Sequence, residues 1–188
     1  MPFGGFVAIM CVNGVKPLVT TDNAHGEDAS ENDADPVYDP HAWFDIDNAM
    51  IYVTNIRNAI RDIDPDHADD YNARTKLYLF QLRVLKQWVA QQVNAIPKNR
   101  RILVTHHDAF GYFARANGFK AESPAGWSTA EIGGISIEDR QKVVQQIRDL
   151  GVKSIFVETS TETETLASIA KETGVKIGGE LYSDAMGP

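Results

Sequence analysis

The alternation of strands and helices in the second half of the chain constrains its fold more than any other sequence feature. Short β-rich runs lie at residues 101–105, 154–157 and 175–177, and helical segments lie at about 109–116, 137–150 and 162–173. A helix is the usual connection between parallel strands, because a parallel pair needs a long crossover. We therefore expect an α/β fold with a parallel sheet built from βαβ units. Residues 121–134, which include several glycines, are expected to be mostly loop.

Ahead of this region, apolar residues recur at spacings of three and four, which is the period of an amphipathic helix. One such stripe covers residues 49–63 and a second covers residues 71–96. Asp64 and Pro65 separate them, and we expect Asp64 to cap the second helix and Pro65 to occupy its first position. Residues 46–96 are therefore predicted to form one long, broken helical element.

Charge argues against one large class of protein. The 188 residues include 18 Lys and Arg against 26 Asp and Glu, which gives a net charge of −8. Nine of the acids fall between Lys16 and Arg57, a stretch with no basic residue. Nucleic-acid-binding proteins usually carry a basic field, so no nucleic-acid partner is expected. The segment from Thr20 to Pro40 is interpreted as a solvated acidic loop.

Cysteine content and hydropathy add further limits. The single cysteine, Cys11, excludes an internal disulfide and a metal site built from several thiolates. No apolar run approaches the ~20 residues of a membrane span, so none is expected in this chain. The apolar start of the sequence lacks the basic region of a signal peptide, and no signal peptide is recognised.

Polar side chains follow each strand predicted in the α/β region. The first strand leads into His106, His107 and Asp108, the second ends at Glu158, and the third leads toward Ser183 and Asp184. Ligands of open parallel sheets bind beyond the carboxyl ends of the strands, which share one edge. We therefore expect these three loops to converge on a binding site.

Individual residues in these loops allow more than one interpretation. Neighbouring residues of an extended segment point to opposite faces, so at most one of His106 and His107 is expected to face the shared edge. Asp108 is expected to cap the following helix and not to bind a ligand. Glu158 ends a buried strand, where a carboxylate is costly unless it is paired or coordinated. Three roles are compatible with this position: a metal ligand, a residue that orients a ligand, or half of an ion pair. The sequence does not distinguish among these three roles.

The other histidines carry less information when each is taken alone. His41 follows an Asp-Pro turn and precedes a helix, where an isolated histidine is simply a polar residue. His25 and His67 are interpreted as histidines without a functional role. Imidazole and carboxylate groups without thiolate suit Zn²⁺, Mn²⁺ or Fe²⁺.

Four segments in order carry a resemblance to a known family. They are DPHAWF at 39–44, VTHHDAFGYF at 104–113, FVETS at 156–160 and GELYSDAMG at 179–187. With WSTAEIG at 127–133, they resemble the zinc- and manganese-binding solute receptors of bacterial ABC transporters, the TroA-like or cluster A-I family. The resemblance covers most of the chain from about residue 39 to residue 187.

The resemblance implies a two-lobed α/β receptor with one long linker helix and a metal bound between the lobes. It assigns the ligands to His41, His107 and Asp184, with His106 ranked below His107. Histidine at position 107 keeps zinc in consideration beside manganese. The implied division is a remnant of the N-terminal lobe with the acidic loop at 1–45, the linker helix at 46–96 and the C-terminal metal-binding lobe at 97–188. On this reading the chain is truncated to the linker helix and the C-terminal lobe.

The implied function is capture of zinc or manganese and delivery to an ABC transporter permease, in the periplasm or another extracytoplasmic compartment, without catalysis. One alternative is a metal-dependent hydrolase in which His41, His107 and Asp184 hold a metal that activates water. Against it, the sequence has no His-Glu-x-x-His motif, and Glu158 is the one clear candidate for a general base. The other alternative is a non-functional fragment that binds no metal.

Overall fold

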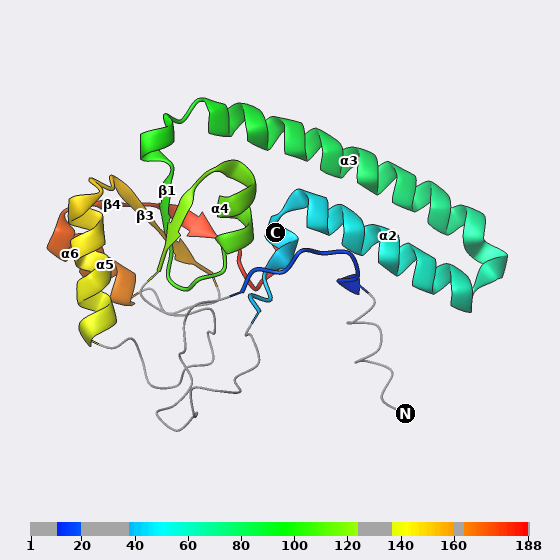
Figure 1. Ribbon diagram of the computed structural model, residues 1–188, viewed down its shortest axis with the longest axis horizontal. Coiled ribbons are helices and arrows are strands. Elements are labelled where there is room, and N and C mark those ends of the chain that lie inside the picture. The colour runs from blue at the N-terminus through cyan, green and yellow to red at the C-terminus, as the bar shows by residue number, and fades with distance from the viewer. Residues whose placement is uncertain (1–10, 20–37, 124–136, 160–163, 188) are drawn as a thin grey trace, which may run out of the picture. The chain divides into compact units, whose positions relative to one another are not determined.

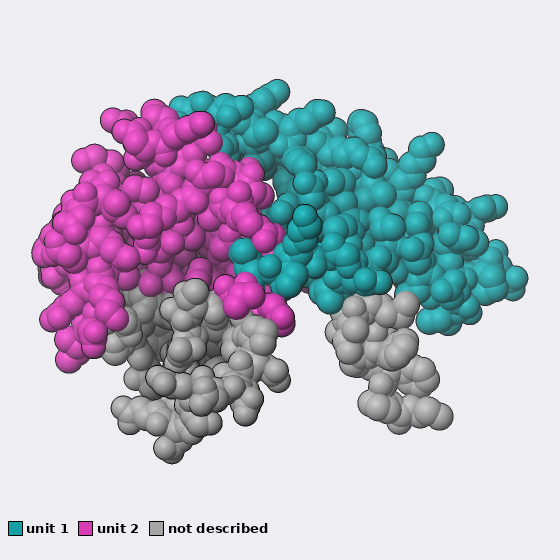
Figure 2. Space-filling model, viewed as in Figure 1, with its two compact units in different colours: residues 1–18, 40–96 teal, residues 19–39, 97–188 magenta. Residues whose placement is uncertain are grey.

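The computed structural model describes residues 11–19, 38–123, 137–159 and 164–187. The chain divides into two compact units, which are coloured separately in Figure 2. Unit 1 comprises Met1–Leu18 and Pro40–Ile96, and unit 2 comprises Val19–Asp39 and Pro97–Pro188. The acidic loop with His25 and the WSTAEIG segment fall outside the described residues. The division predicted at 1–45, 46–96 and 97–188 stays a prediction.

Unit 1 is built on two helices, α2 (Ile46–Ile63) and α3 (Ala68–Asn94). Asp45 caps α2, because its carboxylate accepts a hydrogen bond from the backbone N–H of Asp47 at 3.0 Å. A short 3₁₀ turn, η1 (Ala42–Phe44), precedes α2 and is tied to it by the buried Asn48, whose amide donates to the carbonyl of Ala42. In the part of the chain that the structure describes, no helix has the length and apolar character needed to cross a membrane.

The predicted break between the helices is present, and the chain reverses direction there. Helices α2 and α3 lie side by side as a hairpin, so α3 alone is the long straight helix (Figure 1). The short turn η2 (Pro65–His67) follows Asp64, with Pro65 at its first position as expected. The capping prediction for Asp64 is wrong in its detail. Its carboxylate bonds to two side chains, Nδ1 of His67 at 2.9 Å and the hydroxyl of Tyr71 at 2.7 Å, and makes no capping bond to the backbone.

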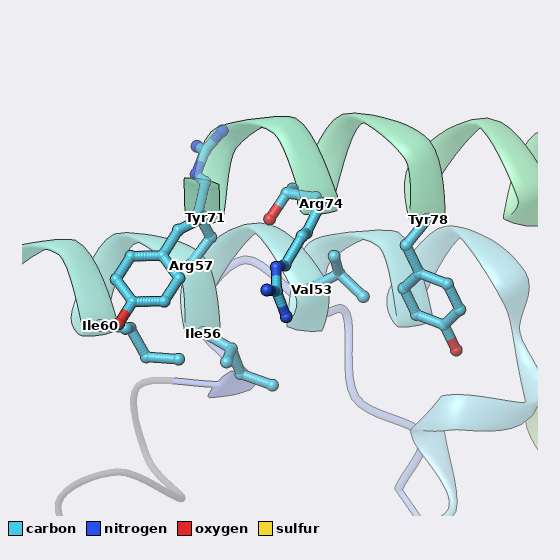
Figure 3. A pocket seen from close by; sticks show the side chains of 8 residues that line it. Val53, Ile56, Arg57, Ile60, Tyr71, Arg74 and Tyr78 are labelled. Carbon is cyan, nitrogen blue, oxygen red and sulfur yellow. The ribbon is translucent and has the colours of Figure 1, made fainter. Parts of the chain in front are cut away.

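A pocket of about 270 Å³ lies between the two helices of unit 1 (Figure 3). Its walls are mainly apolar and include two guanidinium groups. The lining residues are Val53, Ile56, Arg57 and Ile60 of α2 with Tyr71, Arg74, Thr75 and Tyr78 of α3. None of them carries a carboxylate, imidazole or thiolate, so this pocket offers none of the usual transition-metal ligands.

Unit 2 has the predicted α/β architecture. Its strands form two parallel pairs: β1 (Ile102–Val104) with β2 (Lys120–Glu122), and β3 (Ser154–Glu158) with β4 (Lys176–Leu181). The helices are α4 (Gly111–Asn117), α5 (Ile137–Asp149) and α6 (Glu164–Thr173). Of residues 121–134, which were expected to be mostly loop, the first two belong to β2, which ends at Glu122. The remainder of that segment from residue 124 falls outside the described residues.

The core of unit 2 lies between the strands and helices α5 and α6. Its most deeply buried members are Val104 of β1, Ile155 of β3, Ile147 of α5, and Leu166 and Ile169 of α6. This packing brings β1 and β3 into contact, since both contribute to one cluster. The carboxyl ends of the two strands are thereby held near each other.

A bulge in β4 sets the register at the end of β3. Ile155 pairs with Ile177, whereas Phe156 pairs with Gly179, so Gly178 is the extra residue. A Cβ atom at Gly178 would lie 2.9 Å from the ring of Phe156 and 3.1 Å from Cβ of Ser154. Glycine is therefore required at this position by close approach of the neighbouring strand.

The two adjacent glycines give a matched stability test. We expect Gly178→Ala to lower the free energy of unfolding by about 1–3 kcal/mol, as overpacking does in protein cores. Gly179→Ala is the control, because a Cβ there meets nothing within 4 Å. Both changes restrict the unfolded chain equally, so their difference in urea unfolding reports the clash. Equal stability of the two variants would contradict this account of the bulge.

The contact at the helix turn predicts a pH dependence. The hydrogen bond to Asp64 raises the pKa of His67 above its ordinary 6.5, and bonds from Tyr71 and His67 lower the pKa of Asp64 below 3.8. The His67 contribution is thus fully present below pH 6.5 and is lost as pH rises through the raised pKa. The Asp64 contribution is present above pH 3.8 and is lost as pH falls through the lowered pKa.

An NMR titration of the His67 ring protons measures the pKa of His67 directly. Asp64→Asn should return the pKa of His67 toward 6.5, whereas Tyr71→Phe should leave it raised. An unchanged His67 titration in Asp64→Asn would show that the carboxylate is not the cause.

Candidate metal centre

The loop after β1 presents a buried histidine. The hydroxyl of Thr105 and the backbone N–H of Ala109 both donate hydrogen bonds to the carbonyl of His107, at 2.9 and 3.0 Å. These bonds fold the loop tightly, and the side chain of His107 is fully buried. Helix α4 begins only at Gly111, with Phe110 at its N-cap position and no side-chain cap. The prediction that Asp108 caps this helix is wrong, because the tight turn delays the helix.

The carboxylate of Glu158 lies at the end of β3 and holds the His107 loop. Its Oε1 accepts the backbone N–H groups of His106 at 2.8 Å and His107 at 3.1 Å. Its Oε2 lies 2.7 Å from Nδ1 of His107. Both the carboxylate and the imidazole are fully buried. One residue of β3 therefore fixes both the backbone and the ring of the histidine loop.

The third loop brings Asp184 to the other ring nitrogen of His107. Leu181, the last residue of β4, pairs with Glu158, and its carbonyl accepts the N–H of Thr159 at 3.0 Å. Asp184 follows three residues later, with Oδ2 at 3.2 Å from Nε2 of His107. Its side chain is 32% exposed, so this side of the cluster is open to solvent. The structure thus brings the three predicted loops together within unit 2.

Burial and hydrogen bonding act in opposite directions on the pair at the centre. Burial opposes the charged form of Glu158, but hydrogen bonds from His107 and Ser183 outweigh it, so the pKa of Glu158 is lowered from 4.5. Burial likewise opposes protonation of His107, but Glu158 and then Asp184 outweigh it, so the pKa of His107 is raised from 6.5. Each of the two groups therefore favours the charged form of the other.

The geometry suits a metal ligand set. A tetrahedral ion bound at about 2.0–2.2 Å has its ligand atoms roughly 3.3–3.6 Å apart. The separation of 3.2 Å between Nε2 of His107 and Oδ2 of Asp184 is close to this value. An imidazole nitrogen and a carboxylate oxygen are ligands that zinc and manganese both accept. Two candidate ligand atoms therefore lie together within unit 2.

His41 belongs to the other unit. It occupies the N-cap position of η1, and its ring meets that of Trp43 edge-on at a centroid distance of 5.3 Å. Asp39, two residues earlier, belongs to unit 2, where its backbone carbonyl accepts the hydroxyl of Tyr112 at 3.0 Å. The role of His41 as a metal ligand stays a prediction.

The hydrogen-bonding roles of several residues at the site were not identified from the sequence. Ser183, Thr105 and Tyr112 act through hydrogen bonds to Glu158 or to backbone carbonyls. Thr105 and Ser183 flank predicted ligands, but a hydroxyl gives no signal of its partner. His106 contacts Glu158 through its backbone N–H, which any residue except proline supplies.

Comparison with known proteins decides the family. Residues 5–188 match the family described as "Zinc-uptake complex component A periplasmic". The chain belongs to this family of ZnuA proteins. The resemblance found in its motifs is thereby confirmed, together with the predicted α/β receptor fold.

The relatives of this chain are named for the binding of different metals. The manganese-binding lipoprotein MntA of Bacillus subtilis is 38% identical over 155 residues, which cover 80% of this chain and 50% of MntA. The zinc-binding protein TroA of Treponema pallidum is 37% identical, with the same coverages, and the iron-binding protein YfeA of Yersinia pestis is 35% identical over 80% of this chain and 48% of YfeA. The chain spans about half the length of these curated relatives.

Solved structures show the same fold. The periplasmic zinc-binding protein TroA of Treponema pallidum superposes with a TM-score of 0.81 and 31% identity, covering 97% of this chain and 62% of TroA. A Mn-bound periplasmic metal-binding protein from Candidatus Liberibacter asiaticus gives a TM-score of 0.75 and 28% identity, covering 94% and 60%. This ZnuA-family chain therefore holds its candidate ligands on the fold of metal receptors.

Removing the imidazole should destabilise this site in the absence of metal. We expect His107→Ala to lower the free energy of unfolding by about 3–5 kcal/mol, because it leaves Glu158 buried and unpaired. His106→Ala, the neighbouring control, keeps its backbone N–H bond to Glu158 and should cost about 1 kcal/mol or less. Urea unfolding in the presence of a chelator measures both. Similar losses in the two variants would contradict a special role for the buried pair.

Proposed function

We propose that this protein captures a transition-metal ion, zinc or manganese, and hands it to the permease of an ABC transporter. The observation that carries the proposal is the approach of Nε2 of His107 to Oδ2 of Asp184, at 3.2 Å, where the strand ends converge. Family membership supports it, since relatives of this chain are named for the binding of manganese, zinc or iron. The metal is cargo in this proposal and not a resident cofactor.

The proposed ligands are His41, His107 and Asp184. The support for His41 is its place in the Asp-Pro-His motif, which resembles the corresponding motif of the metal receptors. Only Pro40 separates His41 from Asp39, whose carbonyl is held by Tyr112 in unit 2. Three protein ligands leave one position of a tetrahedral ion for water or for a further ligand.

Two imidazoles and one carboxylate favour zinc, whereas additional oxygen ligands would favour manganese. The names of the relatives include both metals, so sequence similarity alone does not select one. Zinc and manganese are therefore both tested below. The proposed location is the periplasm or another extracytoplasmic compartment, in keeping with the family description and the lipoprotein names among the relatives.

We propose binding without catalysis. A metal-dependent hydrolase needs a general base within reach of the metal-bound water. Glu158 was the candidate for this role, but its Oε1 accepts two backbone hydrogen bonds from the His107 loop, its Oε2 lies 2.7 Å from Nδ1 of His107, and the group is fully buried. A carboxylate held in this way is poorly suited to take a proton from a water molecule.

Equilibrium dialysis of the purified chain against Zn²⁺ and Mn²⁺ tests the proposal. We expect one ion per chain, and loss of binding in both His107→Ala and Asp184→Asn. Asp184→Asn is the safer variant, because the side chain is partly exposed and its change should preserve the fold. Asp66→Asn in the η2 turn is a matched control that should bind normally.

The contribution of His41 is tested by His41→Ala. Substitution of a residue that contacts a metal ligand, but not the metal, reduces metal affinity by about 10–100-fold. Loss of a direct ligand should reduce metal affinity by more than the upper end of this range. An unchanged affinity would remove His41 from the ligand set. Absence of any binding by the folded wild-type chain, shown by circular dichroism, would overturn the proposed function and favour a fragment that binds no metal.

A further inference from the structure

We propose that Glu158 is the positioning residue of the metal centre, which fixes His107 with Nε2 on the side of Asp184 and holds the Asp184 loop beside it. This inference rests on the proposed function, since it concerns the same site. It selects one of the three roles that the sequence left open for Glu158. Its support lies in the hydrogen bonds of the carboxylate, all within unit 2.

The two oxygens of Glu158 are already engaged. Two backbone N–H groups, from His106 and His107, point at Oε1 at 2.8 and 3.1 Å. Oε2 faces Nδ1 of His107 at 2.7 Å. A direct metal ligand would have to give up such bonds, because the metal would compete for the same lone pairs. The arrangement favours a carboxylate that binds protein groups and not the metal.

The bond from His107 determines which ring nitrogen meets the metal. Nδ1 carries a proton when it donates to a carboxylate, so Nε2 is the nitrogen with a lone pair in the neutral ring. Nε2 is also the atom that lies 3.2 Å from Asp184. Carboxylates that orient metal-binding histidines in this way raise the basicity of the ligand and fix its ring.

The same carboxylate reaches the loop of the second ligand. The hydroxyl of Ser183 donates a hydrogen bond to Glu158, and Ser183 immediately precedes Asp184. Pairing of Leu181 with Glu158 places this loop beside the end of β3. Glu158 therefore acts on both proposed ligands, on His107 directly and on Asp184 through its neighbour.

Stability alone does not explain a carboxylate at this place. Ile155 and Val157 of the same strand are buried apolar residues, and position 158 is buried as completely. Replacement of a buried ion pair by well-packed apolar groups is often neutral or stabilising, so the pair gives weak evidence of a purely structural role. A role in orienting the ligands accounts for its presence.

Glu158→Gln provides a sharp test. Two N–H groups point at the Oε1 position, so the glutamine oxygen should occupy it and the amide nitrogen should face Nδ1 of His107. An amide nitrogen is a donor, so Nδ1 must then accept and the ring proton must move to Nε2. We expect ¹⁵N NMR of the metal-free chain in alkaline buffer to show Nε2 unprotonated in the wild type and protonated in Glu158→Gln.

The same variant should bind Zn²⁺ or Mn²⁺ about 10–100-fold more weakly, as expected for loss of a partner that orients a ligand. Ser183→Ala should weaken binding without changing the His107 tautomer, and Ser183→Thr should restore it. Glu138→Gln, a substitution of the same kind at an exposed position of α5, should change neither property.

Each outcome can be assigned to one hypothesis. An Nε2 that stays unprotonated in Glu158→Gln, or an unchanged metal affinity in a variant whose tautomer has switched, would overturn the positioning role. A wild-type chain that binds no metal but shows the tautomer switch would refute the proposed function while supporting the action of Glu158 on His107. The NMR measurement of the His107 tautomer needs no metal. Failure of the positioning role can therefore be distinguished from failure of the proposed metal-binding function.

Discussion

The candidate metal centre depends on one buried carboxylate at the end of β3. Removal of Glu158 from water costs several kcal/mol, and its attraction to one imidazolium offsets this only when further hydrogen bonds satisfy the remaining lone pairs. Those bonds come from the backbone of the His107 loop and from Ser183. The same contacts that make burial tolerable therefore join the ends of β1, β3 and β4. A loop at this edge cannot shift without breaking a bond to a buried charge.

The register of β4 is the second constraint, because it decides what reaches that carboxylate. A slip of one residue in a strand turns its side chains to the opposite face. The bulge at Gly178 adds one residue between the pairs Ile155–Ile177 and Phe156–Gly179, and so brings Leu181 opposite Glu158. Asp184 comes three residues after Leu181, and its Oδ2 lies 3.2 Å from Nε2 of His107. A glycine far from the ligands thus contributes to their alignment.

Sequence reasoning identified the α/β fold and the long helices because these depend on periodicity, which is a local property. It missed β2, whose three residues, Lys120–Glu122, have no apolar pattern and owe their strand conformation to pairing with β1. It also did not identify the reversal of the chain at Asp64. Two amphipathic helices have the same sequence pattern whether they continue in one direction or fold back on each other as a hairpin. The errors at Asp64 and Asp108 share one cause: a capping residue was assigned from its position, while its partners were set by tertiary contacts.

In the candidate site, too, some features could be predicted from the sequence and others depend on tertiary contacts. His107 and Asp184 were assigned as ligands through the resemblance of their motifs to the metal receptors, but the role of Glu158 depends on which donor meets each oxygen. Those contacts also explain how the metal-free centre is stabilised. Glu158 and then Asp184 raise the pKa of His107 from opposite sides of its ring, at 2.7 Å from Nδ1 and 3.2 Å from Nε2. In the proposed site the cation would meet Nε2, on the ring edge that faces Asp184, while Nδ1 keeps its contact with Glu158.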